Sequence, residues 1–179
     1  VQDDQRNCTI NQRSKTMSKH IIIADLDGTL ADLTHRLHHV KGTKRDWDAF
    51  HAECVNDKPI TDVIEIVNTF RRRVYDCCGC GYPRKELYVL SGRNATVRKE
   101  TVQWLDRHVS GVEHWSTRLV MRGRHDFRPD TEVKLDMVQD LGFTPDDVLC
   151  IFDDRQSVVD MWRANGYRCL QVNAWKEKK

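Results

Sequence analysis

The chain has 179 residues, of which 39% are hydrophobic and 31% charged, a composition that suits one globular domain with a real core. Its net charge of +2 is too small to indicate nucleic-acid binding by itself. No apolar run reaches membrane-spanning length and no signal-peptide core is visible, so we expect a cytoplasmic protein with no membrane association.

The first residues differ from the rest of the chain. Residues 1–19 are polar and aperiodic, and we expect a disordered leader or an added upstream sequence there, followed by one domain over 20–179. The run Ile21–Ala24 then predicts a buried parallel strand. Asp25 and Asp27 follow this strand, and acids at that place are costly to bury unless they bind a metal or take part in chemistry.

The segment 31–59 departs from simple alternation of strands and helices. Trp47, Phe50 and Cys54 have the spacing of a short helix, which we expect to pack over the mouth of the sheet as a small cap or lid. Three histidines of this segment are predicted to lie on the surface rather than to bind a ligand: His35, His38 and His39.

From Pro59 onward, helices and strands alternate. The apolar patterns predict helices over 59–70, 94–108 and 130–141, a further helix ended by Gly166, and strands over 87–90, 119–121, 148–152 and 169–172. Pro59 is expected in the first turn of its helix, and Asn94 and Asp130 are expected to cap theirs. This alternation predicts a parallel sheet with helices on both faces, an α/β fold.

The seven cysteines are an odd number without a secretory context, which indicates reduced thiols. Cys54, Cys150 and Cys169 lie in apolar patterns and are expected in the core. Three more fall in the loop 75–85, where they could bind zinc, but their spacing matches no standard zinc motif and a loop insertion is favoured: Cys77, Cys78 and Cys80.

Polar residues follow several predicted strands and should converge on one edge of the sheet. Asp25 and Asp153 offer the hard oxygen ligands that suit Mg²⁺, and Asp27 is placed to protonate a leaving oxygen and then activate water. Ser91 and Lys134 can hold the oxygens of a phosphate ester. Each residue alone also has an ordinary explanation, such as a surface ion pair between Lys134 and an acid four positions before it.

Taken in order, these motifs resemble the four signatures of the haloacid dehalogenase (HAD) superfamily: Asp25-Leu26-Asp27-Gly28-Thr29-Leu30, Ser91, Lys134 and Asp153-Asp154. The resemblance implies a Rossmannoid three-layer fold with a central parallel sheet and a small or minimal cap. It also implies Mg²⁺ as cofactor and an aspartyl-phosphate formed on the nucleophile Asp25. The metal ligands that it implies are four aspartates: Asp25, Asp27, Asp153 and Asp154.

A closer resemblance, over roughly residues 20–174, is to the 3′-phosphatase half of phage polynucleotide kinase/phosphatase enzymes. It rests on Ser91-Gly92-Arg93, Asp130-x-x-x-Lys134 and the stretch 153–163. By this resemblance, five residues contact the substrate: Thr29, Arg36, Gly92, Arg93 and Asp130. No phosphate-binding loop of the type Gly-x-x-x-x-Gly-Lys-Ser/Thr is present, so no 5′-kinase half is expected.

These observations favour a Mg²⁺-dependent phosphomonoesterase that acts on a phosphorylated nucleic-acid end or a nucleotide. A phosphatase of free 5′-nucleotides or other small phosphomonoesters is the alternative. A catalytically inactive phosphate- or nucleic-acid-binding module is a third reading, which the complete set of acids and Lys134 opposes. No obligate protein partner is evident from the sequence.

Overall fold

The computed structural model describes residues 20–71 and 85–175. Its centre is a parallel five-stranded sheet in the order β5-β4-β1-β6-β7. The middle strand is β1 (Ile21–Ala24), which lies between β4 (Glu86–Asn94) and β6 (Val148–Arg155). The outer strands are β5 (Leu119–Arg122) and β7 (Cys169–Trp175).

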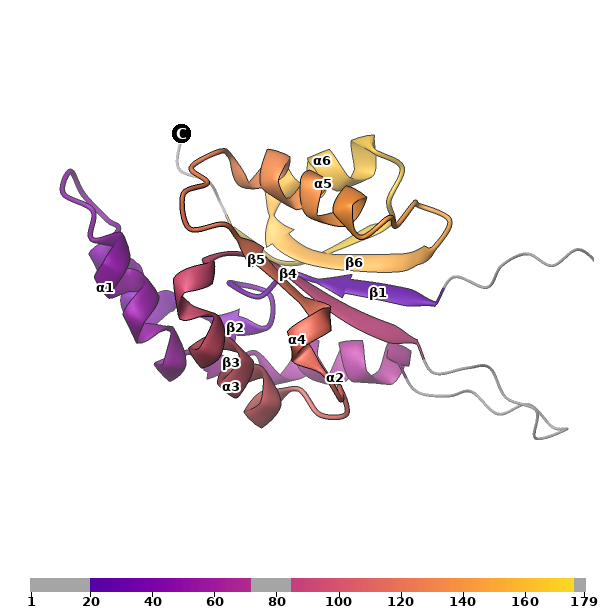
Figure 1. The fold of residues 1–179 in the computed structure, drawn as a ribbon, viewed down its shortest axis with the longest axis horizontal. Helices are drawn as coiled ribbons and strands as arrows, with labels where there is room; N and C mark the ends of the chain where they lie inside the picture. The colour runs from indigo at the N-terminus through magenta and orange to yellow at the C-terminus, as the bar shows by residue number, and fades with distance from the viewer. Residues whose placement is uncertain (1–19, 72–84, 176–179) are drawn as a thin grey trace, which may run out of the picture.

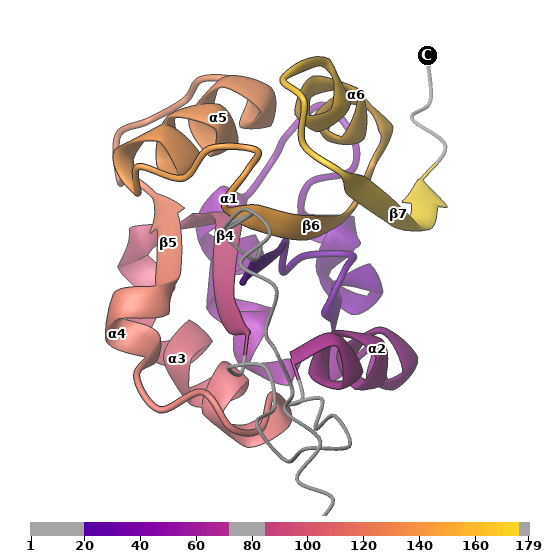
Figure 2. The same cartoon turned by 90° about the vertical axis from the view of Figure 1, so that its right-hand side faces the viewer.

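Helices cover both faces of the sheet (Figure 2). One face is covered by α5 (Asp130–Asp140) and α6 (Gln156–Ala164), and the other by α2 (Thr61–Arg71), α3 (Arg98–His108) and α4 (Trp115–Arg118). Side chains of a strand alternate between its faces, so Ile21 and Ile23 join the core under α5 and α6, while Ile22 and Ala24 join the opposite core. The predicted three-layer α/β fold is therefore confirmed.

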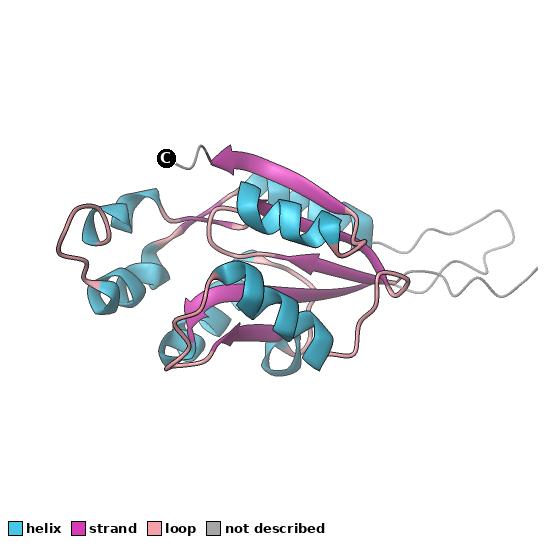
Figure 3. Ribbon diagram, turned by 90° about the horizontal axis from the view of Figure 1, so that it is seen from above, coloured by secondary structure: helices cyan, strands magenta, loops and turns pink. Residues whose placement is uncertain are grey.

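The segment 31–59, called the cap segment below, lies beyond the carboxyl ends of the strands (Figures 1 and 3). It begins and ends with the paired antiparallel strands β2 (Ala31–Asp32) and β3 (Lys58–Pro59). Between them are the 3₁₀-helix η1 (Thr34–His39), helix α1 (Trp47–Ala52) and the 3₁₀-helix η2 (Glu53–Asn56). Of the residues expected to pack inward, Phe50 and Cys54 are buried, whereas Trp47 is 50% exposed.

Two helix starts differ from the prediction. Pro59 pairs with Ala31 across the small sheet, so α2 begins at Thr61 rather than at the proline. Asp130 is the first helical residue of α5 and forms no cap, because its carboxylate accepts hydrogen bonds from Arg122 and Arg155 instead. Asn94 does cap as predicted: its side chain accepts a hydrogen bond from the Thr96 N–H at the start of η3 (Ala95–Val97), which leads into α3.

The cysteines expected in the core are buried free thiols: Cys54, Cys150 and Cys169. Residues 1–19 and the zinc candidates Cys77, Cys78 and Cys80 lie outside the described residues. Among the helices of the described ranges, none has the length and apolar character that crossing a membrane requires.

Candidate active site

Asp25 follows β1 directly and lies at the floor of the site. Its backbone N–H donates to the carbonyl oxygen of Phe152 on β6, at 2.8 Å, which fixes the turn where the strand ends. The Nζ of Lys134, from α5, lies 2.8 Å from Asp25 Oδ1 and 2.8 Å from Asp153 Oδ2. All three side chains are buried, so residues far apart in the sequence form one charged centre at the end of the sheet.

This centre contains a group of carboxylates that suits a hard divalent cation. One oxygen atom from each of Asp25, Asp153 and Asp154 lies within 4.8 Å of the others. Burial, followed by repulsion from Asp153, raises the pKa of Asp154 to about 6. Burial likewise raises the pKa of Asp25, although Lys134 opposes the shift. A bound cation would compensate these carboxylates, and their oxygen donors are those that Mg²⁺ prefers.

Asp27 lies outside this carboxylate group, two residues beyond Asp25. Its Oδ1 accepts hydrogen bonds from Arg93 Nε at 2.8 Å, Arg93 Nη2 at 2.6 Å and Arg36 Nη2 at 2.6 Å. Burial tends to raise the pKa of Asp27, but the attraction of Arg93 and Arg36 outweighs it and lowers that pKa below its usual value. The free protein therefore holds Asp27 as a carboxylate, and a role as metal ligand stays a prediction.

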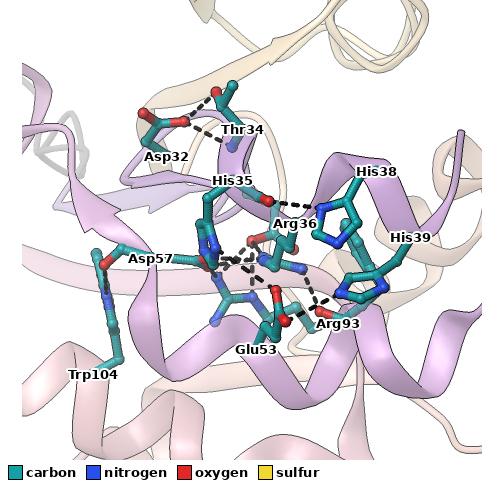
Figure 4. A network of polar contacts seen from close by, with 12 residues as sticks. Asp32, Thr34, His35, Arg36, His38, His39, Glu53, Asp57, Arg93 and Trp104 are labelled. Carbon is teal, nitrogen blue, oxygen red and sulfur yellow. Dashed lines mark hydrogen bonds and ion pairs between the residues drawn. The ribbon is translucent and has the colours of Figure 1, made fainter.

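A second acid, Asp57, completes this network and was not predicted from the sequence (Figure 4). Its Oδ1 and Oδ2 accept hydrogen bonds from Arg36 Nε at 2.7 Å and Arg36 Nη2 at 2.8 Å, and Arg93 Nη2 donates to the same Oδ2. The Asp57 carbonyl oxygen accepts a hydrogen bond from Trp104 Nε1 at 2.8 Å. The acid is thus tied to α3 as well as to both arginines.

Arg36 and Arg93, which the resemblance predicts to contact the substrate, lie inside the protein. Both side chains are fully buried. A guanidinium in a dry site needs carboxylate partners, and Asp27 and Asp57 supply them. Arg93 Nη1 is buried and has no hydrogen-bond partner among the described residues. The substrate role of both arginines stays a prediction.

The remaining predicted residues surround the same end of the sheet. The hydroxyl of Thr29 donates to Asp154 Oδ1 at 3.3 Å, and Ser91 is a buried residue of β4. Gly92 lies against the carboxylate of Asp130: a Cβ at this glycine would come 2.8 Å from Asp130 Oδ1. A side chain at this position would displace the Asp130 carboxylate, so the glycine lets Asp130 approach the strand closely.

All predicted site residues thus lie at the carboxyl ends of β1, β4 and β6 or on elements packed beside them. Gly28 has a φ of +92°, which lets the chain turn back after Asp27 so that the Gly28 N–H donates to the Ala31 carbonyl oxygen at 2.8 Å. The arrangement places a carboxylate, a lysine and a group of acids that could hold a metal ion around one point, and such groups are suited to displacement at phosphorus.

Comparison with known proteins agrees with this geometry. Residues 19–175 match the family model described as the polynucleotide kinase PNKP phosphatase domain. A search of curated proteins finds no match. Among solved structures, the fold resembles a chain of the Pnkp1/Rnl/Hen1 RNA repair complex, with a TM-score of 0.67 and 24% identity over 97% of this chain and 49% of that chain.

Two further structures extend this comparison. A second structure of the Pnkp1/Rnl/Hen1 complex gives a TM-score of 0.66 and 25% identity, over 96% of this chain and 52% of that chain. The haloacid dehalogenase-like hydrolase SP0104 from Streptococcus pneumoniae gives a TM-score of 0.54 and 12% identity, covering 85% and 83% of the two chains. The present chain spans about half the length of the chains in the repair complexes.

The family model covers most of the chain, and the acids and lysine of its predicted signatures converge at one end of the sheet. The chain therefore belongs to the family of the polynucleotide kinase PNKP phosphatase domain and is a phosphoric monoester hydrolase of the HAD type.

Proposed function

We propose that the protein removes the terminal 3′-phosphate from nucleic acids through a Mg²⁺-dependent reaction at Asp25. The observation that supports the reaction best is the buried Asp25 carboxylate, 2.8 Å from Lys134 Nζ and beside Asp153 and Asp154. The match to the PNKP phosphatase domain over residues 19–175 supports the choice of a nucleic-acid end as substrate.

In the proposed first step, an oxygen of the Asp25 carboxylate attacks phosphorus and the bond from phosphorus to the ester oxygen breaks. Asp27 gives its proton to the leaving hydroxyl, and Lys134 stabilises the negative charge on the transferred group. In the second step, Asp27 takes a proton from water, the water oxygen attacks phosphorus, and the Asp25 carboxylate is released together with inorganic phosphate.

The proton needed for the first step is not present on Asp27 in the free protein, because Arg93 and Arg36 hold this carboxylate in its ionised form. The phosphate dianion of an incoming substrate offers the arginines a competing partner. Their partial transfer to the substrate would raise the pKa of Asp27 and let it take up a proton. We therefore assign Arg93 and Arg36 the task of tuning Asp27 between its acid and base forms.

The carboxylates of Asp25, Asp153 and Asp154 would hold the Mg²⁺ ion. When bound, this ion supplies positive charge that offsets the repulsion between the phosphate and the attacking carboxylate. Lys134 contributes a second positive charge to the same centre, and burial tends to lower its pKa while Asp25 and Asp153 raise it, so that it stays protonated at all physiological pH values.

The surface around the mouth supports a polymeric substrate. Trp47 on α1 is 50% exposed, and Phe127, between β5 and α5, is 88% exposed. Both segments lie at the end of the sheet where the strands terminate (Figure 1). A surface hollow of about 440 Å³ is lined by Trp47, by two cations and by two acids: Lys44, Arg45, Asp46 and Asp48. Its charges balance, so the support from this surface is the exposed aromatic side chains, which are suited to stack bases.

The test is phosphate release from a matched panel: an oligonucleotide with a 3′-phosphate, the same oligonucleotide with a 5′-phosphate, the free 3′- and 5′-mononucleotides, and p-nitrophenyl phosphate. The proposal expects the highest kcat/KM on the 3′-phosphorylated oligonucleotide. A higher kcat/KM on free nucleotides would replace it with a small-molecule phosphatase.

The contribution of base stacking can be measured on the same panel. Trp47→Ala should lower kcat/KM on the oligonucleotide by roughly 5- to 150-fold, since stacking one base is worth about 1–3 kcal/mol, and should leave p-nitrophenyl phosphate hydrolysis unchanged. Ile66→Ala is the matched control, because Ile66 is 46% exposed on α2, away from the mouth. Equal losses on both substrates would remove Trp47 from the substrate path.

A further inference from the structure

The cap segment contains a second group of metal-binding side chains, separate from the aspartates of the active site. It consists of His38 and His39 on η1 and Glu53 on η2, which Figure 4 shows together. Each offers one ligand atom, and these atoms lie within 4.8 Å of one another. No residue of this group belongs to the catalytic machinery described above.

The orientation of the rings suits coordination. His38 Nδ1 lies 2.9 Å from the carbonyl oxygen of His35, so that its N–H is directed to the backbone and its Nε2 keeps a lone pair. Histidine ligands of metals commonly have their second nitrogen fixed by a carbonyl or carboxylate in this way. The backbone contact therefore sets the tautomer that a ligand at Nε2 requires.

His39 and Glu53 lie in direct contact. His39 Nε2 is 3.1 Å from Glu53 Oε1, in an ion pair whose angles do not meet those of a regular hydrogen bond. Two ligands of one tetrahedral zinc ion, each about 2.0–2.1 Å from the metal, lie roughly 3.3 Å apart. The separation of His39 and Glu53 is close to that value.

The neighbouring His35 connects this group to the active site. Its Nδ1 lies 3.8 Å from Glu53 Oε2, and its Nε2 lies 2.9 Å from Oδ1 of Asp57, the acid that holds Arg36 and Arg93. A carboxylate behind a histidine ring is the usual second partner at zinc sites, where it orients the ring. The two nitrogens of the His35 ring thus connect Glu53 to Asp57.

We propose that His38, His39 and Glu53 bind a divalent transition-metal ion of the zinc class. Two imidazoles and one carboxylate are the donors that such ions prefer, whereas Mg²⁺ favours sites made only of oxygen ligands. The ion would join η1, which carries Arg36, to η2, which leads directly into Asp57. The bound ion would hold η1 and η2 together and so stabilise the positions of Arg36 and Asp57 beside Asp27.

The proposal is tested by zinc binding to the full chain, prepared without a polyhistidine tag, stripped with a chelator and kept in excess Mg²⁺ to occupy the aspartate centre. Calorimetry should give one Zn²⁺ per chain at this site, and Co²⁺ should give the visible absorption of a site with nitrogen and oxygen ligands. The double variant His38→Gln/His39→Gln and the single variant Glu53→Gln should each weaken zinc binding at least roughly a hundredfold.

Two control variants separate this site from other zinc-binding groups. His114→Gln changes an exposed histidine outside the cap segment and should bind zinc as the unchanged chain does. The triple variant Cys77→Ser/Cys78→Ser/Cys80→Ser should also keep this zinc. Thermal unfolding should show that zinc raises Tm in the unchanged chain and in both controls, but not in Glu53→Gln.

Absence of zinc binding by the unchanged chain would overturn the proposal. Zinc retained by both Glu53→Gln and the double histidine variant would overturn it as well, and so would zinc lost only in the cysteine variant. Glu53→Gln keeps the size of a partly exposed side chain, so it tests the site even if the double variant unfolds. None of these readouts depends on phosphatase activity, so the proposed function can fail independently.

Discussion

Asp57 holds Arg36 through a two-point contact: Arg36 Nε lies 2.7 Å from Oδ1 and Arg36 Nη2 lies 2.8 Å from Oδ2. Both side chains are completely buried, and Arg93 donates to the same carboxylate. Buried guanidinium groups are costly to leave without a partner, so Asp57 is a structural requirement of this site. It also limits how far either arginine can move toward a substrate.

The first prediction follows from this contact. Asp57→Asn should lower the free energy of unfolding by about 3–5 kcal/mol, because it removes the charge that compensates two buried arginines. Urea unfolding monitored by circular dichroism measures the change. Asp146→Asn, a change at an exposed acid, should stay within about 0.5 kcal/mol of the unchanged chain. Equal stability of the two variants would show that the arginines need no buried counter-charge.

The second prediction concerns the role of Arg36. Since it contacts Asp27, Asp57 and the Phe50 carbonyl oxygen rather than the surface, Arg36→Ala should lower kcat/KM by the same factor on a 3′-phosphorylated oligonucleotide and on a free 3′-mononucleotide, which share the same leaving group. Arg36→Lys should not restore activity, because one ammonium group cannot replace three nitrogens in a plane. A loss confined to the oligonucleotide would instead place Arg36 against the part of the strand beyond its terminal nucleotide.

The third prediction concerns proton transfer by Asp27. Asp27→Asn should reduce kcat on an alkyl phosphate far more than on an aryl phosphate, because an aryloxide leaves without being protonated. The measurement is the ratio of kcat for the variant to that for the unchanged chain on each substrate. Matching ratios on the two substrates would argue that Asp27 does not protonate the leaving group.

The fourth prediction is a pH dependence of stability from the same residue. The pKa of Asp27 is lowered in the folded chain, so its stabilising effect is complete above the unfolded pKa of about 3.9 and disappears as pH falls through the folded value. In metal-free buffer, Asp27→Asn should therefore be less stable than the unchanged chain near neutral pH, and the difference should shrink below about pH 4. A constant difference across this range would contradict the ionised Asp27.

The sequence was sufficient to predict the centre of the site. The apolar run Ile21–Ile23, the acids after it and the later strand ends could be aligned because parallel strands bring their carboxyl ends to one edge. The meeting of Lys134 with Asp25 and Asp153 follows from that topology and from the resemblance to HAD phosphatases.

The surroundings of Asp27 could not be predicted in the same way. Asp57 lies in a polar stretch of the cap segment, with no periodic pattern to indicate that it is buried. The path of the chain between β2 and β3, which brings it to the arginines, depends on packing against α3 and not on local preference. The available indication was electrostatic: two arginines beside one aspartate in a dry site need a second acid.

Asp130 is a second residue whose contacts could not be predicted from the local sequence. Its position before an apolar helix predicts a cap, but Arg122 and Arg155 compete successfully for its carboxylate. A local preference worth about 1 kcal/mol is outweighed by two charged contacts from other elements. Such long-range partners are visible only once the strands are assembled.

The central claim, nucleophilic attack by Asp25 on a 3′-phosphorylated nucleic-acid end, is tested most directly by acid-quenching the reaction with a 3′-³²P-labelled oligonucleotide. The account predicts transient labelled protein whose label is released by hydroxylamine, as expected for an acyl phosphate, and maps to the peptide that contains Asp25. Asp25→Asn should give no labelled protein and on the order of a thousandfold or more loss of kcat. Phosphate release without labelled protein at any quench time, or label retained by Asp25→Asn, would contradict it.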